Sequence, residues 1–122
     1  MKKLYARMMK AECPIDPATM ETTVPFLQHN TVEHALKDSG VRQIFFFVDP
    51  KDSAIFSITI YDTEEDLSNA MQEATSEFRF QSLAALGCTA VDARVFEVVA
   101  GQVNPDAPEV DFKSLVPPIT TD

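Results

Sequence analysis

Three hydroxyl-bearing side chains occupy alternate positions between residues 54 and 61. Ser57, Thr59 and Tyr61 would share one face of a β-strand, because successive side chains of a strand point to opposite faces. From one face they can hydrogen-bond the carbonyl group of a small ligand, which makes them candidate ligand-binding residues. The alternative is ordinary polar filling of a sheet face, since Thr and Tyr are common strand residues.

Arg7 and Glu97 are a second set of candidate ligand-binding residues. They fall in the first and the last predicted strand, which are neighbours in the fold that the element order indicates. Side chains on adjacent strands can pair, so these two would form a polar anchor for an anionic or phenolic ligand. The alternative, which we favour, is a structural ion pair at the contact between two copies of the chain. Desolvation offsets much of the attraction in such a buried pair.

The two histidines, His29 and His34, lie in one predicted helix. Five residues at about 100° each place them about 140° apart, so they do not bind one metal ion from a single helix face. Either ring can overhang a pocket between helix and sheet, where a neutral imidazole serves as a general base. We take His34 as the candidate catalytic residue. A boundary or surface histidine is the alternative.

Neither Cys13 nor Cys88 has a histidine or a basic cluster beside it, as reactive thiols do, so neither is proposed as a nucleophile. We expect two reduced thiols, and a disulfide between them is the alternative. The sequence contains no glycine-rich phosphate loop, no Cys-x-x-Cys motif and no aromatic-basic RNA-binding motif. We therefore expect neither a metal site nor a cofactor.

The composition predicts one folded domain with an acidic surface. The 122 residues are 45% hydrophobic, and 19 acidic against 10 basic residues give a net charge of -9. Binding to nucleic acid or to an acidic membrane surface requires clustered Lys and Arg, so we expect neither partner. No signal-peptide core and no apolar run of the ~20 residues of a membrane span is found. We expect a soluble cytoplasmic protein.

The apolar pattern predicts the elements that would position these side chains. Strands are expected over residues 3–12, 41–49, 54–61 and 92–100, and helices over residues 16–39, 63–78 and 80–87. Asp16 is suited to cap the first helix. Pro25 is expected to kink or restart that helix near Thr23, and Gly40 to end it.

The order βαββαβ predicts an α+β, ferredoxin-like domain, in which a four-stranded antiparallel sheet carries both helices on one face. Residues 1–101 would form this domain. Residues 102–122 would form a proline-rich C-terminal tail that packs on the domain or on a partner subunit. The candidate residues must then lie on one or other face of this sheet.

We expect the helices to cover the positions that are apolar in every strand, namely Leu4, Ala6, Met8, Ile44, Phe46, Val48, Phe56, Ile58, Ile60, Phe96 and Val98. The five candidate ligand-binding residues would then share the other face with Tyr5, Met9, Phe45, Phe47, Ile55, Val95 and Val99. That face is too apolar to be left in water on a monomer. The pattern therefore predicts a homodimer through the sheet face, most simply with two-fold symmetry.

The chain resembles the dimeric α+β barrel superfamily, in particular its antibiotic-biosynthesis-monooxygenase-like branch. The resemblance covers residues 3 to about 101 and rests on the Tyr5-Ala6-Arg7 opening strand, the Phe-rich hairpin with its Val48-Asp49 exit, the junction from Tyr61 to Asp66, and the strand from Val95 to Val99. It implies a dimeric barrel. The family includes cofactor-free oxygenases of polycyclic aromatics or quinols and haem-degrading enzymes. The latter use an Asn, a His and a Trp, and this chain has no Trp.

The resemblance implies a small-molecule-binding protein or a cofactor-free monooxygenase-like enzyme acting on a small apolar or aromatic substrate. Its pocket would lie between sheet and helices. Oxygenation without a cofactor relies on an electron-rich substrate anion, and the resemblance suggests His34 as the base that generates it. The alternative is a non-catalytic dimeric binding or sensor module, which a cavity too small for a ligand would favour.

Overall fold

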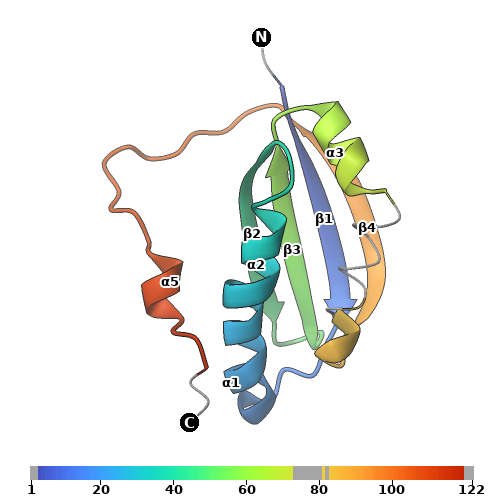
Figure 1. Cartoon of the computed structure of the whole chain (residues 1–122), viewed down its shortest axis with the longest axis vertical. Helices are drawn as coiled ribbons and strands as arrows, with labels where there is room; N and C mark the ends of the chain where they lie inside the picture. The colour runs from blue at the N-terminus through green and yellow to red at the C-terminus, as the bar shows by residue number, and fades with distance from the viewer. Residues whose placement is uncertain (1–2, 73–80, 82, 120–122) are drawn as a thin grey trace.

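The structure, a computed structural model, describes residues 3–72, 81 and 83–119 (Figure 1). Its strands are β1 (Leu4–Glu12), β2 (Val41–Asp49), β3 (Ala54–Tyr61) and β4 (Thr89–Val98). Its helical elements are α1 (Pro17–Phe26), the π-helical η1 (Leu27–Thr31), α2 (Val32–Ala35), α3 (Glu64–Ala70) and α5 (Phe112–Leu115). None of these helices is long and apolar enough to cross a lipid bilayer.

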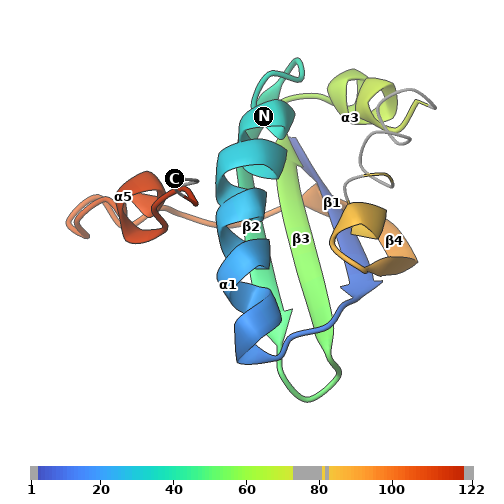
Figure 2. The same ribbon diagram turned by 60° about the horizontal axis from the view of Figure 1, so that its bottom comes forward.

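The four strands form one antiparallel sheet in the order β2-β3-β1-β4, so that β3 and β1 are central. Helices α1, α2 and α3 lie on the same side of this sheet, as Figures 1 and 2 show. This arrangement confirms the predicted ferredoxin-like α+β fold. Strand β4 begins at Thr89, earlier than the predicted residue 92.

The predicted assignment of the sheet faces is wrong for β1, β3 and β4. The helices cover the odd-numbered positions of β1 and β3, where Met9 and Ile55 share a core cluster with Leu27 of η1. A second cluster places Tyr61 of β3 against Leu67 of α3. Only in β2 do the even-numbered positions face the helices, as predicted. The five candidate ligand-binding residues therefore lie under the helices and not on the open face.

The β2–β3 hairpin explains this error. Its four-residue loop pairs Asp49 with Ala54, so an odd position of β2 lies opposite an even position of β3. Strands β1 and β3 instead pair odd with odd positions, as Arg7 with Thr59. Side-chain faces follow the register, so apolar positions of equal parity do not share a face in all strands. The open face carries Leu4, Ala6, Met8, Phe45, Phe47, Phe56, Ile58, Ile60, Phe96 and Val98.

The first helix begins where the sequence predicts. The Asp16 carboxylate accepts hydrogen bonds from the Thr19 backbone N–H at 3.1 Å and from its hydroxyl at 2.7 Å. These bonds lower the pKa of Asp16. The kink predicted near Thr23 is not found there, because α1 continues through Pro25. The hydrogen-bond pattern changes to the π type directly afterwards, in η1.

The predicted end of this helical stretch at Gly40 is wrong, because α2 ends at Ala35 and residues 36–40 form turns, but Gly40 does adopt the expected left-handed conformation, with a φ of 77°. It also lies against α3, since a Cβ at this position would be 2.0 Å from Oδ2 of Asp66. Thr63 caps α3 by accepting a hydrogen bond from the Asp66 N–H at 3.0 Å. Of the predicted second half of this helical region, residues 73–80 and 82 lie outside the described residues, and residues 83–85 are helical.

Cys13 and Cys88 form a disulfide, which overturns the expectation of two reduced thiols. The register explains their proximity, because Glu12 lies opposite Thr89 at the ends of β1 and β4. Both cysteines are buried in the first core cluster. Disulfides are rare in cytosolic proteins, and the cytoplasmic location stays a prediction.

The C-terminal tail runs from β4 to the opposite edge of the sheet, where α5 lies beside α1 and outside β2 (Figures 1 and 2). Residues 99–111 are exposed throughout. The tail contacts the domain again at α5, which packs against η1. There the His29 ring donates a hydrogen bond from Nε2 to the Val116 carbonyl, and the Phe112 ring meets Phe45 edge-on at 6.2 Å.

Candidate functional site

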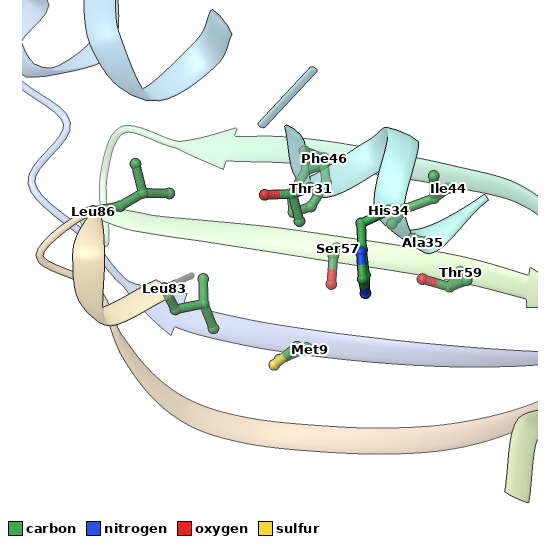
Figure 3. Close-up of a pocket in the computed structure, with 10 residues that line it drawn as sticks. All are labelled: Met9, Thr31, His34, Ala35, Ile44, Phe46, Ser57, Thr59, Leu83 and Leu86. Carbon is green, nitrogen blue, oxygen red and sulfur yellow. The ribbon is translucent and has the colours of Figure 1, made fainter. Parts of the chain in front are cut away.

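A small pocket lies between α2 and the centre of the helix-covered sheet face (Figure 3). Strands β2, β3 and β1 form its floor. Ser57 of β3 lies opposite Phe46 on one side and Met9 on the other. Thr59, two residues further along β3, lies opposite Ile44. The register therefore sets two hydroxyl groups side by side in a floor that is otherwise apolar.

The helical stretch supplies the roof of this pocket through Thr31, His34 and Ala35. Figure 3 shows the His34 ring pointing from α2 toward β3, between Ser57 and Thr59. His34 is exposed as a residue, whereas Thr59 is only 2% exposed. The imidazole thus lies at the mouth of the pocket, where it can exchange protons with solvent while the hydroxyls lie deeper.

The pocket is narrow. Leu83 and Leu86 also line it, and its cavity volume is about 30 Å³. Such a volume has room for about two water-sized groups. An imidazole and two hydroxyls around so small a space can accept a proton from a bound group and hydrogen-bond the oxygen that becomes negative.

Thr31 is a pocket residue that the sequence analysis missed. Its Oγ1 is buried and has no hydrogen-bond partner within the described part of the chain. Buried hydroxyls are normally hydrogen-bonded, so this one is available to a ligand or to a water. Its spacing was a usable indication, because residues three apart on a helix share a face and Thr31 precedes His34 by three.

The other three candidates lie outside this pocket. Arg7 is 6% exposed and lies opposite Thr59 on β1, so it borders the pocket floor. Tyr61 is completely buried in the cluster under α3. Glu97 lies opposite Tyr5 and forms an exposed ion pair with Lys3 at 3.4 Å. The structure thus brings His34, Ser57 and Thr59 together, with Arg7 beside them, and separates Tyr61 and Glu97 from them.

Comparison with known proteins gives matches in structure but not in sequence. No protein-family model matches the chain, and no curated protein matches it. Solved structures do match over most of its length. They include two proteins described as putative antibiotic biosynthesis monooxygenases and one described as a cofactor-independent oxygenase, which confirms the resemblance at the level of the fold.

Three of these structures illustrate the likeness. SnoaB, a cofactor-independent oxygenase from Streptomyces nogalater, is 16% identical, with 87% of this chain and 100% of that chain covered and a TM-score of 0.54. A monooxygenase from the gene ActVA-Orf6 of Streptomyces coelicolor, in complex with nanaomycin D, is 13% identical over 86% and 93% of the two chains, with a TM-score of 0.55. A dimeric ferredoxin-like protein from an uncultured marine organism is 11% identical over 83% and 99%, with a TM-score of 0.59. At these identities the likeness is one of fold.

Proposed function

We propose that this protein is a homodimeric, cofactor-free monooxygenase-like enzyme that acts on a small apolar or aromatic substrate. One observation supports this function above the others. The His34 ring points at two hydroxyls, Ser57 and Thr59, across a pocket whose other lining is mostly apolar. The solved structures with the same fold include a cofactor-independent oxygenase and a monooxygenase in complex with the ligand nanaomycin D.

His34 would act as the general base. It removes a proton from a CH₂ group beside a ring ketone, or from the O–H of the tautomeric phenol, and the substrate oxygen carries the resulting negative charge. Ser57 and Thr59 donate hydrogen bonds to that oxygen, as does Thr31 from the roof. The anion reduces O₂, a carbon–oxygen bond forms, and the resulting peroxide loses water. In balance, a CH₂ group and O₂ give a C=O group and H₂O.

The small volume limits what enters this pocket. About 30 Å³ admits the reacting edge of a ring but not a ring system. The body of an aromatic substrate must therefore lie outside the pocket, next to it. The same small volume is the observation that favours the second candidate function, a non-catalytic dimeric binding or sensor module.

The dimer in this proposal rests on the open face of the sheet. Phe45, Phe47 and Phe96 are 38%, 48% and 45% exposed there, beside half-buried aliphatic residues of β3. Such a continuous apolar surface is unusual for a monomer. A structural neighbour described as a dimeric ferredoxin-like protein supports a homodimer. The face carries the apolar residues of β1, β3 and β4 that were predicted to lie under the helices.

Turnover of anthrone, whose CH₂ group is acidified by a ketone, tests the proposal. The purified dimer is mixed with anthrone in air, and anthraquinone is measured by mass spectrometry against a protein-free blank and an anaerobic sample. His34→Ala should lower the rate by roughly 10²- to 10⁴-fold, the usual contribution of a general base. His29→Ala is the matched control, since His29 faces the tail, and it should retain the rate.

Two results would overturn this function. If the wild-type protein gives no product above the blank with anthrone or with smaller hydroxynaphthalenes, the chain is the non-catalytic module. If the protein is active and His34→Ala is as active as wild type, His34 is not the base.

A further inference from the structure

The disulfide and the candidate pocket share one core cluster. Met9 and Leu83 line the pocket, and both belong to the same buried cluster as Cys13 and Cys88. Leu86 also lines the pocket and packs against this cluster. Figure 3 shows the two leucines together at one end of the pocket. The bond between the cysteines therefore lies next to one wall of the pocket, the wall that the leucines form.

Cys88 directly follows the turn that carries the two leucines, here called the leucine turn (residues 83–87). Gly87 ends this turn with a φ of 75°. The N–H of Cys88 donates to the Leu83 carbonyl at 2.8 Å, and the N–H of Gly87 donates to the Ala84 carbonyl at 3.0 Å. These two hydrogen bonds around a glycine of positive φ form a Schellman motif, in which the residue after the glycine packs on the last helical turn. A displacement of Cys88 therefore displaces the leucine turn as well.

The disulfide joins β1 and β4 where their ladder ends. Glu12 and Thr89 form the terminal pair, and an irregularity of register precedes it on β1. Terminal pairs beyond such an irregularity open more readily than pairs in the middle of a sheet. Cys13 is held independently, because its N–H donates to the Ser53 carbonyl at 2.9 Å. Breaking the disulfide would thus release the β4 side, with the leucine turn, and leave the β1 side in place.

A reductant can reach this disulfide from the solvent. An open pocket of about 340 Å³ lies at the same ends of the strands, and Cys13 lines it together with Pro14 and Gly87. This pocket has room for a small dithiol. A thiolate of the dithiol attacks Sγ of Cys13 and releases Cys88 as a thiolate, and the second thiol then displaces Cys13. Two electrons and two protons pass to the protein, which gains two thiols, and the dithiol becomes a cyclic disulfide.

We propose that the Cys13–Cys88 disulfide is a redox-controlled gate of the pocket that contains His34; the kind of molecule that passes the gate rests on the function proposed above. With the bond formed, the two leucines keep the pocket at about 30 Å³, and only the edge of a ring enters. With the bond reduced, the leucine turn moves outward and the pocket admits a whole ring. The redox state of the two cysteines thus sets the size of group that reaches the imidazole.

Amide exchange tests whether reduction releases the leucine turn. Dithiothreitol reduces the full-length protein, and the gain of two hydrogen atoms is confirmed by mass spectrometry. The sequence has two cysteines, so the reagent acts on this bond alone. Exchange of the Gly87 and Cys88 amides should become at least about tenfold faster on reduction, as expected for a local opening. Unchanged exchange at both amides would overturn the proposal.

A second variant separates local release from a general loss of stability. Leu67→Ala truncates a buried residue of the other core cluster, so it destabilises the fold and leaves the disulfide intact. Exchange of the Gly87 and Cys88 amides should not change in this variant, because local opening does not depend on global unfolding.

Phenol binding tests whether the pocket opens. Phenol carries one ring and one hydroxyl, and NMR titration followed at the Ser57 and Thr59 amides reports its entry into the pocket. The reduced protein should bind phenol at least about tenfold more tightly than the oxidised protein. Oxidised Leu67→Ala should bind it no more tightly than the oxidised wild type.

Variants of the pocket wall give the same result without a reductant. Leu86→Ala shortens the wall and keeps the disulfide, so it should bind phenol tightly in both redox states. Leu36→Ala is the matched control, because Leu36 is exposed and does not line the pocket. The double variant C13S/C88S should bind phenol as the reduced protein does. If the double variant does not fold, Leu86→Ala keeps the test decisive.

Equal phenol affinity of the oxidised and reduced proteins, or no binding in either state, would overturn the gate, and the disulfide would then have a structural role alone. An equal gain of affinity in oxidised Leu67→Ala would also overturn it, because lower stability would be the cause. The gate and the proposed function can fail separately, since neither amide exchange nor phenol binding requires turnover. A protein that admits phenol on reduction but does not oxidise anthrone would lose the function and keep the gate.

Discussion

The two faces of the sheet divide apolar and polar residues in an unusual way. The face under the helices carries Arg7, Ser57 and Thr59 among its apolar residues. The open face, which has no helix over it, is formed at its centre by Met8, Ile58 and Phe45, lying side by side on three strands. In a sheet with one solvated face the polar residues are normally on the open side. The location of these polar residues under the helices indicates that both faces of the sheet are covered, one by the helices and the other by a second protein surface.

The difference between the two faces also indicates two roles, a binding site on the covered face and an assembly surface on the open face. A covered face that is partly polar can build a site, because its hydroxyls are held in an enclosed, mostly apolar space. The open face carries Lys10, Asp92 and Arg94 toward one end, but its centre is apolar and offers area, which suits assembly. Changes on the open face should therefore alter association, and changes on the covered face should alter stability and the site. Four predictions test this division.

The largest effect on assembly is expected from a charge at the centre of the open face. Ile58→Arg should convert the proposed homodimer to monomers, because the buried guanidinium would have no partner in the interface. The dimer dissociation constant should rise by about 100-fold or more, which corresponds to about 2.8 kcal/mol. Sedimentation velocity over a concentration series measures it. Val103→Arg, in the tail and 77% exposed, is the control. A wild-type monomer at all concentrations would show that the open face is not an assembly surface.

The next effect concerns the covered face at the end away from the pocket. Tyr61 is fully buried against Leu67, so Tyr61→Ala should lower the free energy of unfolding by about 3–5 kcal/mol. Tyr61→Phe keeps the ring and should cost only about 1 kcal/mol, the value of a typical hydrogen bond. Urea unfolding measures both. Equal losses in the two variants would mean that the hydroxyl and not the ring stabilises this cluster, and that Tyr61 has a polar role that the packing does not indicate.

The third prediction concerns the disulfide that joins the ends of β1 and β4. Reduction of Cys13–Cys88 should lower the free energy of unfolding by about 2–4 kcal/mol. Because both cysteines belong to the covered-face core, the dimer should persist after reduction. Thermal unfolding with and without reductant measures the loss, and the double variant C13S/C88S must be insensitive to reductant. A wild-type melting temperature that does not respond to reductant would contradict a stabilising bond.

The element order and the capping residues could be derived from the sequence because they depend on local chemistry. Asp16 and Thr63 accept hydrogen bonds at the predicted helix starts, and Gly40 adopts its predicted left-handed conformation. The faces of the sheet could not be derived in the same way. They depend on the pairing of Asp49 with Ala54 across the hairpin, which reverses the parity of β2 relative to β3. The apolar pattern could not identify the face that the helices cover, because both faces of the sheet are rich in apolar residues.

The candidate site could be predicted only in part, because local geometry relates only some of its residues. Ser57 and Thr59 are two residues apart on one strand, so their shared face followed from local geometry, and the structure sets them beside His34. The disulfide and the packing of the tail against η1 and β2 depend on segments that are far apart in sequence, and no local pattern indicates them. The residue type of Thr31 also gives no indication of a site, because threonine is an ordinary helix residue. Only the structure shows that its hydroxyl is buried without a partner among the described residues.

The smallest effect is expected at α5, where the C-terminal tail packs against the domain. Asp111 caps α5 by accepting hydrogen bonds from the Ser114 hydroxyl and N–H at 2.7 and 3.4 Å, and these bonds lower the pKa of its carboxyl from 3.8. A carboxyl whose pKa is lower in the folded state stabilises that state fully above pH 3.8 and loses this contribution as the pH falls through the lower value.

Acidification toward pH 2 should therefore loosen α5 and with it the contact of Phe112 with Phe45, before the sheet itself unfolds. Amide exchange at Ser114, followed by NMR from pH 6 downward, measures the change. The carboxylate of Glu33 also faces the tail through Lys113, so the comparison is made in a Glu33→Gln background. Asp111→Asn keeps a capping oxygen that does not titrate, and it should leave the tail equally protected across the range. If the two proteins lose protection together, the cap of α5 does not control the position of the tail, and apolar contacts such as that of Phe112 with Phe45 hold the tail instead.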